Sequence, residues 1–463
     1  MVVAVTADDL RVKNLGACRI DSPLQKLLCE RRKSFHNVDE SDRVLFDCTA
    51  SAAVERAIRI EELPAFEPAG PRRKIFFDPS KSRAAVVTCG GLCPGMNDVI
   101  RALVMELHFH YGVRKIYGFC HGYQGFIARH QRDVVDLTPS AVGRINEHGG
   151  TFLGTSRGEQ DPEEIVDCLE RMNINLLFVI GGDGTLRGAM RIVDVIEERG
   201  AKISVVGIPK TIDNDIMFID QSFGFQTAFS VAAESITAAH VEAKASPNGV
   251  GLVKVMGRHS GFIACYSALS KSVANFVLIP EVPFELDGEY GFLEGLRKHL
   301  LRAGHAVIVV AEGAGQNLFQ AADGTDASGN SKLHDIGVYL KNRINAYFAA
   351  MGMELNLKYI DPSYNVRSVP ANAYDSGYCI RLAHNAVHAA MSGRTEMIVG
   401  RWHGRFVHVP MALAIRERNE VDPDGDLWIS VLESTGQSRS YCPPMQACEI
   451  VPKPHSEPVA TKV

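Results

Sequence analysis

Short apolar runs that end in glycine alternate with longer amphipathic stretches along most of this chain. Such runs are typical of buried parallel strands, and the longer stretches have the periodicity of helices. We predict strands at 84–88, 178–180, 203–208, 251–256, 276–280 and 306–311. We predict helices from about residue 98, over about ten residues after GGDGT, at 222–241 and at 376–391, with a hairpin at 396–410. The alternation restarts after residue 225, which predicts an α/β protein with two Rossmann-like, doubly wound lobes.

The two ends of the chain lack this alternation. Residues 1–80 have weak periodicity and finish in a proline-rich stretch, so we expect an N-terminal extension that packs on the core or on a neighbouring subunit. Residues 416–463 contain prolines and little pattern, and we expect a C-terminal extension there. Between the extensions, we assign residues 81–224 and 366–415 to one lobe and residues 225–365 to the other.

A loop with the sequence GGDGT follows the strand at 178–180 and is suited to binding phosphates. Gly181, Gly182 and Gly184 have no Cβ to keep the backbone away from a polyphosphate, and the amides that open the next helix favour anions. Asp183, within the loop, can hold Mg²⁺ directly or through water.

A second loop, with the sequence PKTIDND, follows the strand at 203–208 and is suited to acid/base chemistry. Asp213 and Asp215 are two residues apart, so in an extended segment they project to the same side, with the cation of Lys210 beside them. Parallel strands of a βαβ unit open on one edge of the sheet, so we expect both loops to share a crevice. Asp213 could instead be a structural turn former that caps the next helix.

Composition and charge narrow the function classes. A hydrophobic content of 46% and a charged content of 22% are typical of a soluble globular protein, and the net charge of −5 disfavours nucleic-acid or membrane-surface partners. No apolar run reaches the ~18 residues that span a bilayer. The 11 cysteines have no paired CxxC spacing, which disfavours zinc and disulfides and favours a reducing, cytoplasmic location.

The two loops together resemble the 6-phosphofructokinase family, and further motifs agree in order over roughly residues 80 to 415. GGDGT alone is shared with NAD kinases and diacylglycerol-type lipid kinases, whereas the pair of motifs at this spacing is more specific. The resemblance implies phosphorylation of fructose 6-phosphate at its 1-hydroxyl, with Mg²⁺, by a cytoplasmic, allosteric homo-oligomer, a tetramer or dimer. A non-enzymatic sensor of sugar phosphates is the alternative from another class, although both Asp183 and Asp213 are present.

The resemblance also assigns roles to individual residues. It makes 81–224 with 366–415 the nucleotide-binding lobe and 225–365 the fructose-6-phosphate lobe. The implied nucleotide-binding residues are Gly91, Arg157, Gly158, Gly182, Asp183, Gly184 and Thr185, with Asp183 as the metal ligand. The implied catalytic residues are Lys210, Asp213, Asp215 and Arg258, and Asp213 is the implied base. The implied sugar-binding residues are Thr211, Ile212, Asp213, Met256, Gly257, Arg258, Glu312, Lys358, Tyr364 and Arg367.

Two positions bear on the phosphoryl donor. Lys210 is the form found in diphosphate-dependent enzymes of the family, and Gly184 is the form found in ATP-dependent ones. An Asp at 184 would crowd and repel the α-phosphate of ATP, whereas Lys210 can neutralise either donor. We therefore predict ATP as the donor, in an enzyme most similar to the plant and trypanosomatid type, and keep diphosphate as the alternative.

The cations that a neighbouring subunit usually lends to the site depart from the bacterial pattern. Gly249 stands where bacterial enzymes have one arginine, and Lys358 stands where they have a second. Lys358 can still bind phosphate as a point charge, but Gly249 cannot.

Overall fold

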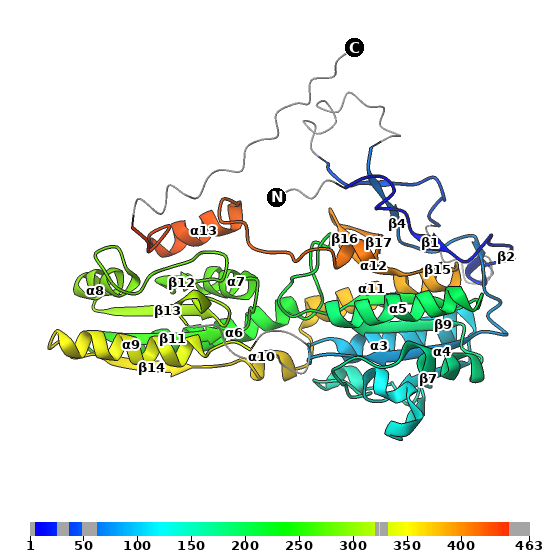
Figure 1. The fold of residues 1–463 in the computed structure, drawn as a ribbon, viewed down its shortest axis with the longest axis horizontal. Coiled ribbons are helices and arrows are strands. Elements are labelled where there is room, and N and C mark those ends of the chain that lie inside the picture. Colours follow the sequence, from blue (N-terminus) through cyan, green and yellow to red (C-terminus); the bar gives the residue numbers. More distant parts are fainter. Residues whose placement is uncertain (1–4, 26–36, 49–62, 320–323, 325–331, 444–463) are drawn as a thin grey trace, which may run out of the picture.

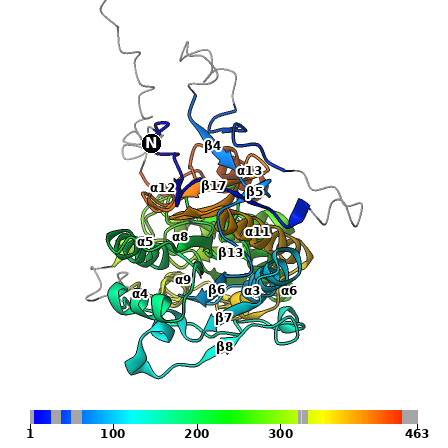
Figure 2. The same cartoon turned by 90° about the vertical axis from the view of Figure 1, so that its right-hand side faces the viewer.

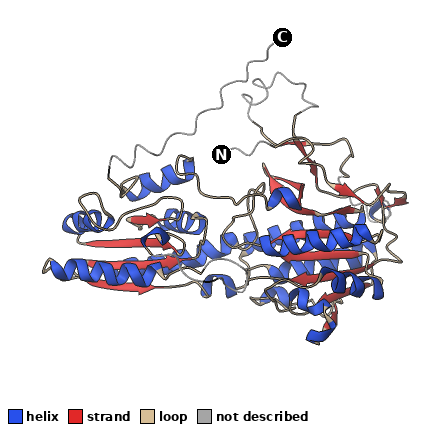
Figure 3. Ribbon diagram, in the orientation of Figure 1, coloured by secondary structure: helices blue, strands red, loops and turns tan. Residues whose placement is uncertain are grey.

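The computed structural model describes residues 5–25, 37–48, 63–319, 324 and 332–443. Two α/β lobes lie side by side along the long axis of the molecule (Figure 1), and each is built around its own sheet. Figure 3 shows the strands of each lobe as a separate group flanked by helices. The predicted fold class is therefore confirmed.

The first lobe contains a nine-stranded sheet in the order β3-β4-β17-β16-β10-β9-β6-β7-β8. Its parallel centre consists of β16 (Met397–Trp402), β10 (Ser204–Pro209), β9 (Leu176–Gly181), β6 (Arg83–Thr88) and β7 (Lys115–Phe119). The chain runs outward from β6 to β7 and then returns to β9 on the other side of β6. The strand order thus reverses between β6 and β9, which is the position where doubly wound sheets bind ligands.

Helices cover both faces of this sheet. Along β9, Phe178 and Ile180 belong to one core cluster with helices α3 (Met96–Met105) and α11 (Ala373–Met391). Leu177 and Val179 belong to the opposite cluster with α4 (Pro162–Arg171) and α5 (Asp183–Glu198). This alternation follows from the two-residue period of a strand. Helix α5 has 16 residues, so our expectation of about ten was too short; the helix continues past Gly188 and ends just before Gly200, which has φ 65°.

The second lobe contains a four-stranded sheet in the order β12-β13-β11-β14, in which all neighbours are parallel. The strands are β11 (Gly249–Val255), β12 (Phe276–Leu278), β13 (His305–Ala311) and β14 (Asn356–Ile360). The helices are α6 (Phe225–Lys244), α7 (Phe262–Lys271), α8 (Phe292–Ala303) and α9 (Ile336–Ala350). None of the described helices is both long and apolar enough to cross a bilayer.

Much of the N-terminal extension belongs to the first lobe. Strands β3 (Val44–Leu45) and β4 (Ala65–Pro68) extend the sheet beyond β17 (Arg405–Pro410), as Figure 2 shows at the upper edge of the lobe. The other short elements are β1 (Lys13–Asn14), β2 (Ile20–Asp21), β5 (Lys74–Ile75), β8 (Val134–Asp136), β15 (Arg394–Thr395), α10 (Asn365–Ser368) and α12 (Met411–Ala414). The predicted hairpin at 396–410 is present as β16 and β17.

The C-terminal extension reaches the second lobe. Helix α13 (Asp426–Thr435) packs against α7 and β12. Residues 444–463 of this extension, and residues 1–4, 26–36 and 49–62 of the N-terminal one, lie outside the described part of the chain. The boundaries that we assign to the lobes stay a prediction.

A buried charge cluster attaches the N-terminal extension to the first lobe. Glu67 on β4 accepts hydrogen bonds from Arg72 at 2.8 Å and from Arg394 at 2.9 Å, and both arginines are buried. Although burial raises it, the pKa of the Glu67 carboxyl is held well below its usual range by His408 first and then by Arg394 and Arg72. Glu40 also pairs with both arginines, but its side chain is 65% exposed.

We expect Glu67→Ala to lower the free energy of unfolding by about 3 kcal/mol, because it leaves two buried guanidinium groups without their main counter-charge. Denaturant unfolding of the purified protein measures this loss. The matched control is Glu40→Ala, which removes an exposed partner of the same arginines and should cost less than about 1 kcal/mol. Equal losses in the two variants would contradict the assigned importance of Glu67.

Candidate active site

A pocket of about 840 Å³ lies between the two lobes. Its first-lobe wall comes from the loops that follow β6, β9 and β10, and its second-lobe wall from the loops that follow β11, β13 and β14. All six are loops at the carboxyl ends of parallel strands, where α/β sheets bind ligands. The GGDGT and PKTIDND loops therefore share one crevice, as predicted.

The GGDGT loop opens helix α5 and leaves free space in front of it. Asp183 is the first residue of the helix, so the unpaired amides of the first turn lie at this end. A Cβ placed on Gly184 would meet no atom within 4 Å. The loop thus offers an anion-binding helix terminus beside open volume.

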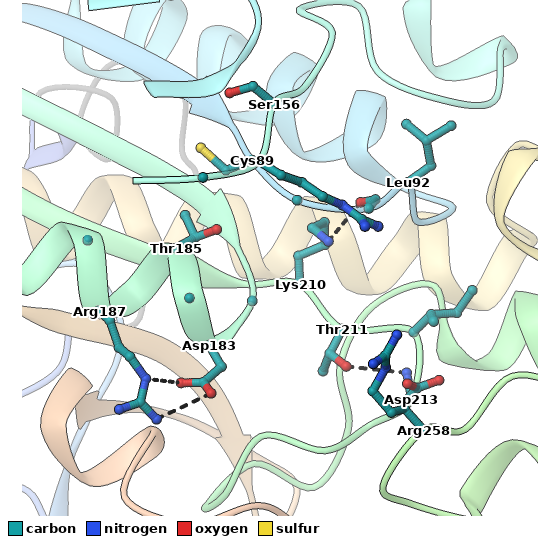
Figure 4. Close-up of a pocket in the computed structure, with 18 of the residues that line it drawn as sticks. Cys89, Leu92, Ser156, Asp183, Thr185, Arg187, Lys210, Thr211, Asp213 and Arg258 are labelled. Atoms are coloured by element: carbon teal, nitrogen blue, oxygen red, sulfur yellow. Dashed lines mark hydrogen bonds and ion pairs between the residues drawn. The ribbon is translucent and has the colours of Figure 1, made fainter. Parts of the chain in front are cut away.

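The carboxylate of Asp183 is held by guanidinium groups. Arg187 donates to it from one turn along α5 at 3.0 and 3.3 Å (Figure 4). Arg418 lies 3.8 Å from it. Within the described ranges, no three acidic, histidine or cysteine side chains gather to form a protein-only metal cage. A single carboxylate at an open pocket nevertheless fits Mg²⁺, which commonly takes one or two protein carboxylates together with waters and substrate phosphates.

Hydrogen bonds within the PKTIDND loop fix its shape. The Thr211 hydroxyl donates to Asp215 Oδ1 and accepts from the backbone amide of Asp213 at 3.3 Å. Asn214 adopts a left-handed conformation with φ 60°, and its side chain accepts from the amide of Ser222 at 2.7 Å. Asp213 and Asp215 are consequently held by the fold before any ligand binds.

The carboxyl group of Asp213 lies in a desolvated part of the pocket. Its Oδ1 atom is buried and has no hydrogen-bond partner among the described residues. Burial and the nearby carboxylates of Asp215 and Glu312 raise its pKa well above the usual 3.8, although the backbone and side chain of Arg258 oppose the shift. A buried carboxyl with a raised pKa and an unpaired oxygen is suited to accept a proton from a hydroxyl.

Lys210 connects two loops of the first lobe. Its buried ammonium donates to the carbonyl oxygen of Gly91, in the loop after β6, at 2.8 Å (Figure 4). Burial, and then the charge of Arg157, lower the pKa of Lys210. Besides supplying charge, the side chain therefore anchors the PKTIDND loop to the glycine loop.

Two guanidinium groups converge on the glycine loop from distant parts of the chain. A Cβ on Gly91 would lie 3.6 Å from Arg157 Nη2 and 3.9 Å from Arg367 Nη1. Arg367 also stacks over the ring of Tyr364, with 4.8 Å between its Cζ and the ring centroid. Convergent guanidinium groups beside a backbone without a side chain make a suitable site for phosphate.

The structure brings most of the predicted site residues together. Those that line the pocket are Gly91, Arg157, Gly158, Gly182, Asp183, Gly184, Thr185, Lys210, Thr211, Ile212, Asp213, Asp215, Met256, Arg258, Glu312, Tyr364 and Arg367. Their individual roles stay predictions.

Two predicted residues do not line the pocket. Gly257, with φ 129°, supports the wall from behind, where its carbonyl accepts from the amide of Gly313 at 3.0 Å. Lys358 is exposed and lies within β14, whereas the pocket is lined by residues that follow this strand, from Asp361 onward. Contact of Lys358 with the pocket of a neighbouring subunit stays a prediction.

Several pocket residues escaped the sequence-based prediction. Arg187 could have been found, because it lies four residues after Asp183 on the predicted helix. Lys254 precedes the predicted Met-Gly-Arg turn and pairs with Asp361 at 2.9 Å and Asp335 at 3.2 Å. Arg418 lies in an unpatterned segment and had no sequence signal. Its position between Asp183 and Asp215 comes from the tertiary structure alone.

Comparison with models of known protein families identifies the family of this chain. The phosphofructokinase family model matches residues 83–390, which contain both loops and nearly all of the pocket. The chain belongs to the phosphofructokinase family. This assignment confirms the resemblance predicted from GGDGT and PKTIDND.

Relatives in the phosphofructokinase family match over most of their length. A protein of Amycolatopsis methanolica named ATP-dependent 6-phosphofructokinase is 56% identical over 94% of this chain and 96% of its own length. ATP-dependent 6-phosphofructokinase 7 of Arabidopsis thaliana is 48% identical over 80% of this chain and 77% of its own length, in agreement with the predicted plant type. The pyrophosphate-dependent phosphofructokinase structure from Marinobacter aquaeolei has a TM-score of 0.64 at 20% identity and covers 78% of this chain and 93% of its own. At that identity the likeness concerns the fold alone.

The raised pKa of Asp213 predicts the pH dependence of the enzyme. A base must be ionised to accept a proton, so kcat/KM should fall as the pH decreases, with a midpoint clearly above the usual 3.8. Glu312→Gln removes one of the two carboxylates that repel the Asp213 charge, so it should move this midpoint to lower pH. A pH–rate profile of each protein measures the shift. A midpoint that rises or stays fixed in Glu312→Gln would contradict this account.

Proposed function

We propose that this protein is an ATP-dependent 6-phosphofructokinase, which transfers the γ-phosphoryl group of ATP to the 1-hydroxyl of fructose 6-phosphate. The products are fructose 1,6-bisphosphate and ADP. The observation that carries the proposal is the placement of Asp183 and Asp213 across one pocket, each on its own loop (Figure 4). The names of relatives that match nearly the whole chain support the same activity.

The residues suit direct in-line transfer without a covalent intermediate. Asp213 accepts the proton of the sugar hydroxyl, because it lines the pocket and its Oδ1 has no hydrogen-bond partner among the described residues. Thr211 and Asp215 hold Asp213 in place through its backbone amide. Lys210 and Arg258 line the pocket as cations that offset the negative charge developing on the transferred group.

Asp183 is the residue that would hold Mg²⁺, and Mg²⁺ would neutralise phosphate charge when bound. Its carboxylate pairs with Arg187 and Arg418 in the structure, so a metal ion has to compete with those two cations. Gly182, Gly184 and Thr185 surround it at the helix terminus, with Gly91, Arg157 and Gly158 on the adjoining wall. This set accommodates the phosphate chain of a nucleotide.

The second-lobe wall suits a sugar phosphate. Arg258 and Arg367 are fixed cations for its phosphate, and Glu312 is an acceptor for its hydroxyl groups. Met256 and Tyr364 add apolar surface for the sugar ring. A wall that combines fixed cations, a hydroxyl acceptor and apolar surface is suited to a polar ligand that carries one anionic group.

We also infer that the protein acts in the cytoplasm as a homo-oligomer, a dimer or tetramer. The exposed position of Lys358 leaves this cation available to a neighbouring subunit. Position 249 has no room for a side chain, because a Cβ there would lie 1.9 Å from the carbonyl oxygen of Ala243. Of the two cations that a neighbouring subunit usually lends to the site, the one at position 249 is therefore absent because no side chain fits there.

The choice of ATP over diphosphate depends on the open space at Gly184. We expect Gly184→Asp to lower kcat/KM for ATP by about 100-fold, because the new carboxylate would occupy and repel the α-phosphate position. Stability should be unaffected, because the position has free space and acidic residues suit the first turn of a helix. Steady-state kinetics with each donor, and thermal unfolding, measure these effects.

The size-matched control is Gly184→Ala, which adds a methyl group without charge and should keep most of the ATP activity. Turnover of the unaltered protein with diphosphate but not with ATP would refute the assignment of the donor. Undiminished use of ATP by Gly184→Asp would refute the role given to this glycine.

Replacement of Asp213 tests the base. We expect Asp213→Ser to lower kcat by at least about 1,000-fold, because the hydroxyl proton loses its acceptor while the phosphate contacts remain. Calorimetric titration should find fructose 6-phosphate binding within about threefold of the unaltered protein. A small change in kcat would show that another group accepts the proton.

A further inference from the structure

The segment that follows α12 runs from the first lobe to the second, contributes Arg418 to the pocket and is bonded to both lobes. On the first-lobe side, the backbone amide of Asn419 donates to the carbonyl oxygen of Asp215 at 3.0 Å. The side-chain amide of Asn419 donates to the carbonyl oxygen of Asn214 at 3.1 Å. On the second-lobe side, the hydroxyl of Ser260 donates to the carbonyl oxygen of Asn419 at 2.5 Å. The backbone of this crossing segment, residues 416–421, is thus fixed against the PKTIDND loop.

A shared carboxylate strengthens the second-lobe attachment. Glu281 Oε1 accepts from the amide of Val421 and from the amide of Gly261, both at 2.8 Å. Gly261 directly follows Ser260 in the turn that begins α7. The crossing segment therefore keeps its place without help from the side chain of Arg418.

Arg418 points from this segment into the pocket. Its Nη1 donates to Asp215 Oδ2 at 3.1 Å, and its Nη2 lies 3.8 Å from Asp183 Oδ2. Its backbone forms an antiparallel bridge with Ile216, next to Asp215. One planar cation thus lies between the carboxylates of the two loops that face each other across the site.

We propose that Arg418 is a positioning residue, which holds Asp215 so that the loop bearing Asp213 stays in its reactive place. The inference rests on the proposed function. A continuous set of hydrogen bonds supports it: Arg418 to Asp215, Asp215 to the Thr211 hydroxyl, and that hydroxyl to the amide of Asp213. Arg418 acts through Asp215 and Thr211 and does not take the proton itself.

Charge gives this arginine a second effect on the same loop. Asp215 raises the pKa of Asp213 by repulsion, and the two carboxylates lie two residues apart. Without Arg418, the remaining side-chain partner of Asp215 in the described structure is the neutral hydroxyl of Thr211. An uncompensated Asp215 would move away from Asp213 and carry Thr211 with it, because like charges in a poorly solvated site repel strongly.

The test compares Arg418→Met with Arg416→Met in the full-length protein. Arg416 precedes the pocket residue by two positions and pairs with Asp9 on the outer surface, so it is a matched control. We expect Arg418→Met to lower kcat by about 10- to 100-fold, the effect of a small misplacement of a reactive group. The calorimetric Kd for fructose 6-phosphate and the melting temperature should stay close to those of the unaltered protein. Arg416→Met should keep kcat within about twofold.

Two further variants separate positioning from general damage. Arg418→Lys keeps the charge but not the planar fork, so its kcat should lie between those of the unaltered protein and Arg418→Met. The double variant Asp215→Asn with Arg418→Met should be no slower than Asp215→Asn alone, because one interaction cannot be lost twice.

Each remaining outcome overturns a distinct claim. An unaltered protein that fails to phosphorylate fructose 6-phosphate with ATP overturns the proposed function, and this inference with it. An active protein in which Arg418→Met keeps its kcat, or in which the two losses multiply fully in the double variant, overturns the inference alone. A loss of kcat together with a lower melting temperature and weaker sugar binding also overturns it, because that pattern indicates a structural role.

Discussion

The site depends on a balance of charge in a partly desolvated pocket. Asp183, Asp213, Asp215 and Glu312 all line it, and carboxylates at short range in a protein interior repel one another strongly. Cations from separate parts of the chain offset this repulsion: Arg157, Arg187, Arg191, Lys210, Lys254, Arg258, Arg367 and Arg418. These cations come from both lobes and from the segment after α12, so the charge balance of the pocket depends on the tertiary structure.

Within this balance, the structure keeps one carboxyl group apart from the rest. Asp183 and Asp215 have guanidinium partners, whereas Asp213 Oδ1 is buried without a hydrogen-bond partner in the part of the chain that the structure describes. Environment thus distinguishes identical groups: Asp183 and Asp215 are paired with guanidinium groups, whereas burial and the neighbouring carboxylates raise the pKa of Asp213. Such separation of titratable groups is a general means of assigning acid/base roles in one site.

The sequence predicted the architecture and most of the pocket, because both depend on local patterns. Apolar runs that end in glycine predicted the parallel strands, and parallel strands bring their following loops to one edge. Asp183 and Asp213 could be placed face to face on that basis alone. The predicted length of α5 was too short because the prediction did not consider the glycine that follows its end. The N-terminal strands were missed because two-residue pairings have no periodicity.

Contacts between distant segments were beyond that reasoning. Arg418 belongs to a stretch without pattern, and only tertiary packing brings it to Asp215. Lys210 was expected to supply charge, but its bond to Gly91 depends on the spacing of two loops that sequence does not give. Lys358 lies within β14 and not in the loop that follows it, so it does not line the pocket of its own subunit, and its contact with a neighbouring subunit stays a prediction.

The route of the chain also limits how the lobes can move. Within the described residues it passes between the lobes three times: before α6, near α10 and through residues 416–421. Three tethers across one gap prevent one half from sliding along the other or turning about a single connection. A movement of the lobes has to bend all three tethers at once, so we expect closure on the substrates to be a small rocking motion that preserves the lateral alignment of the reacting groups.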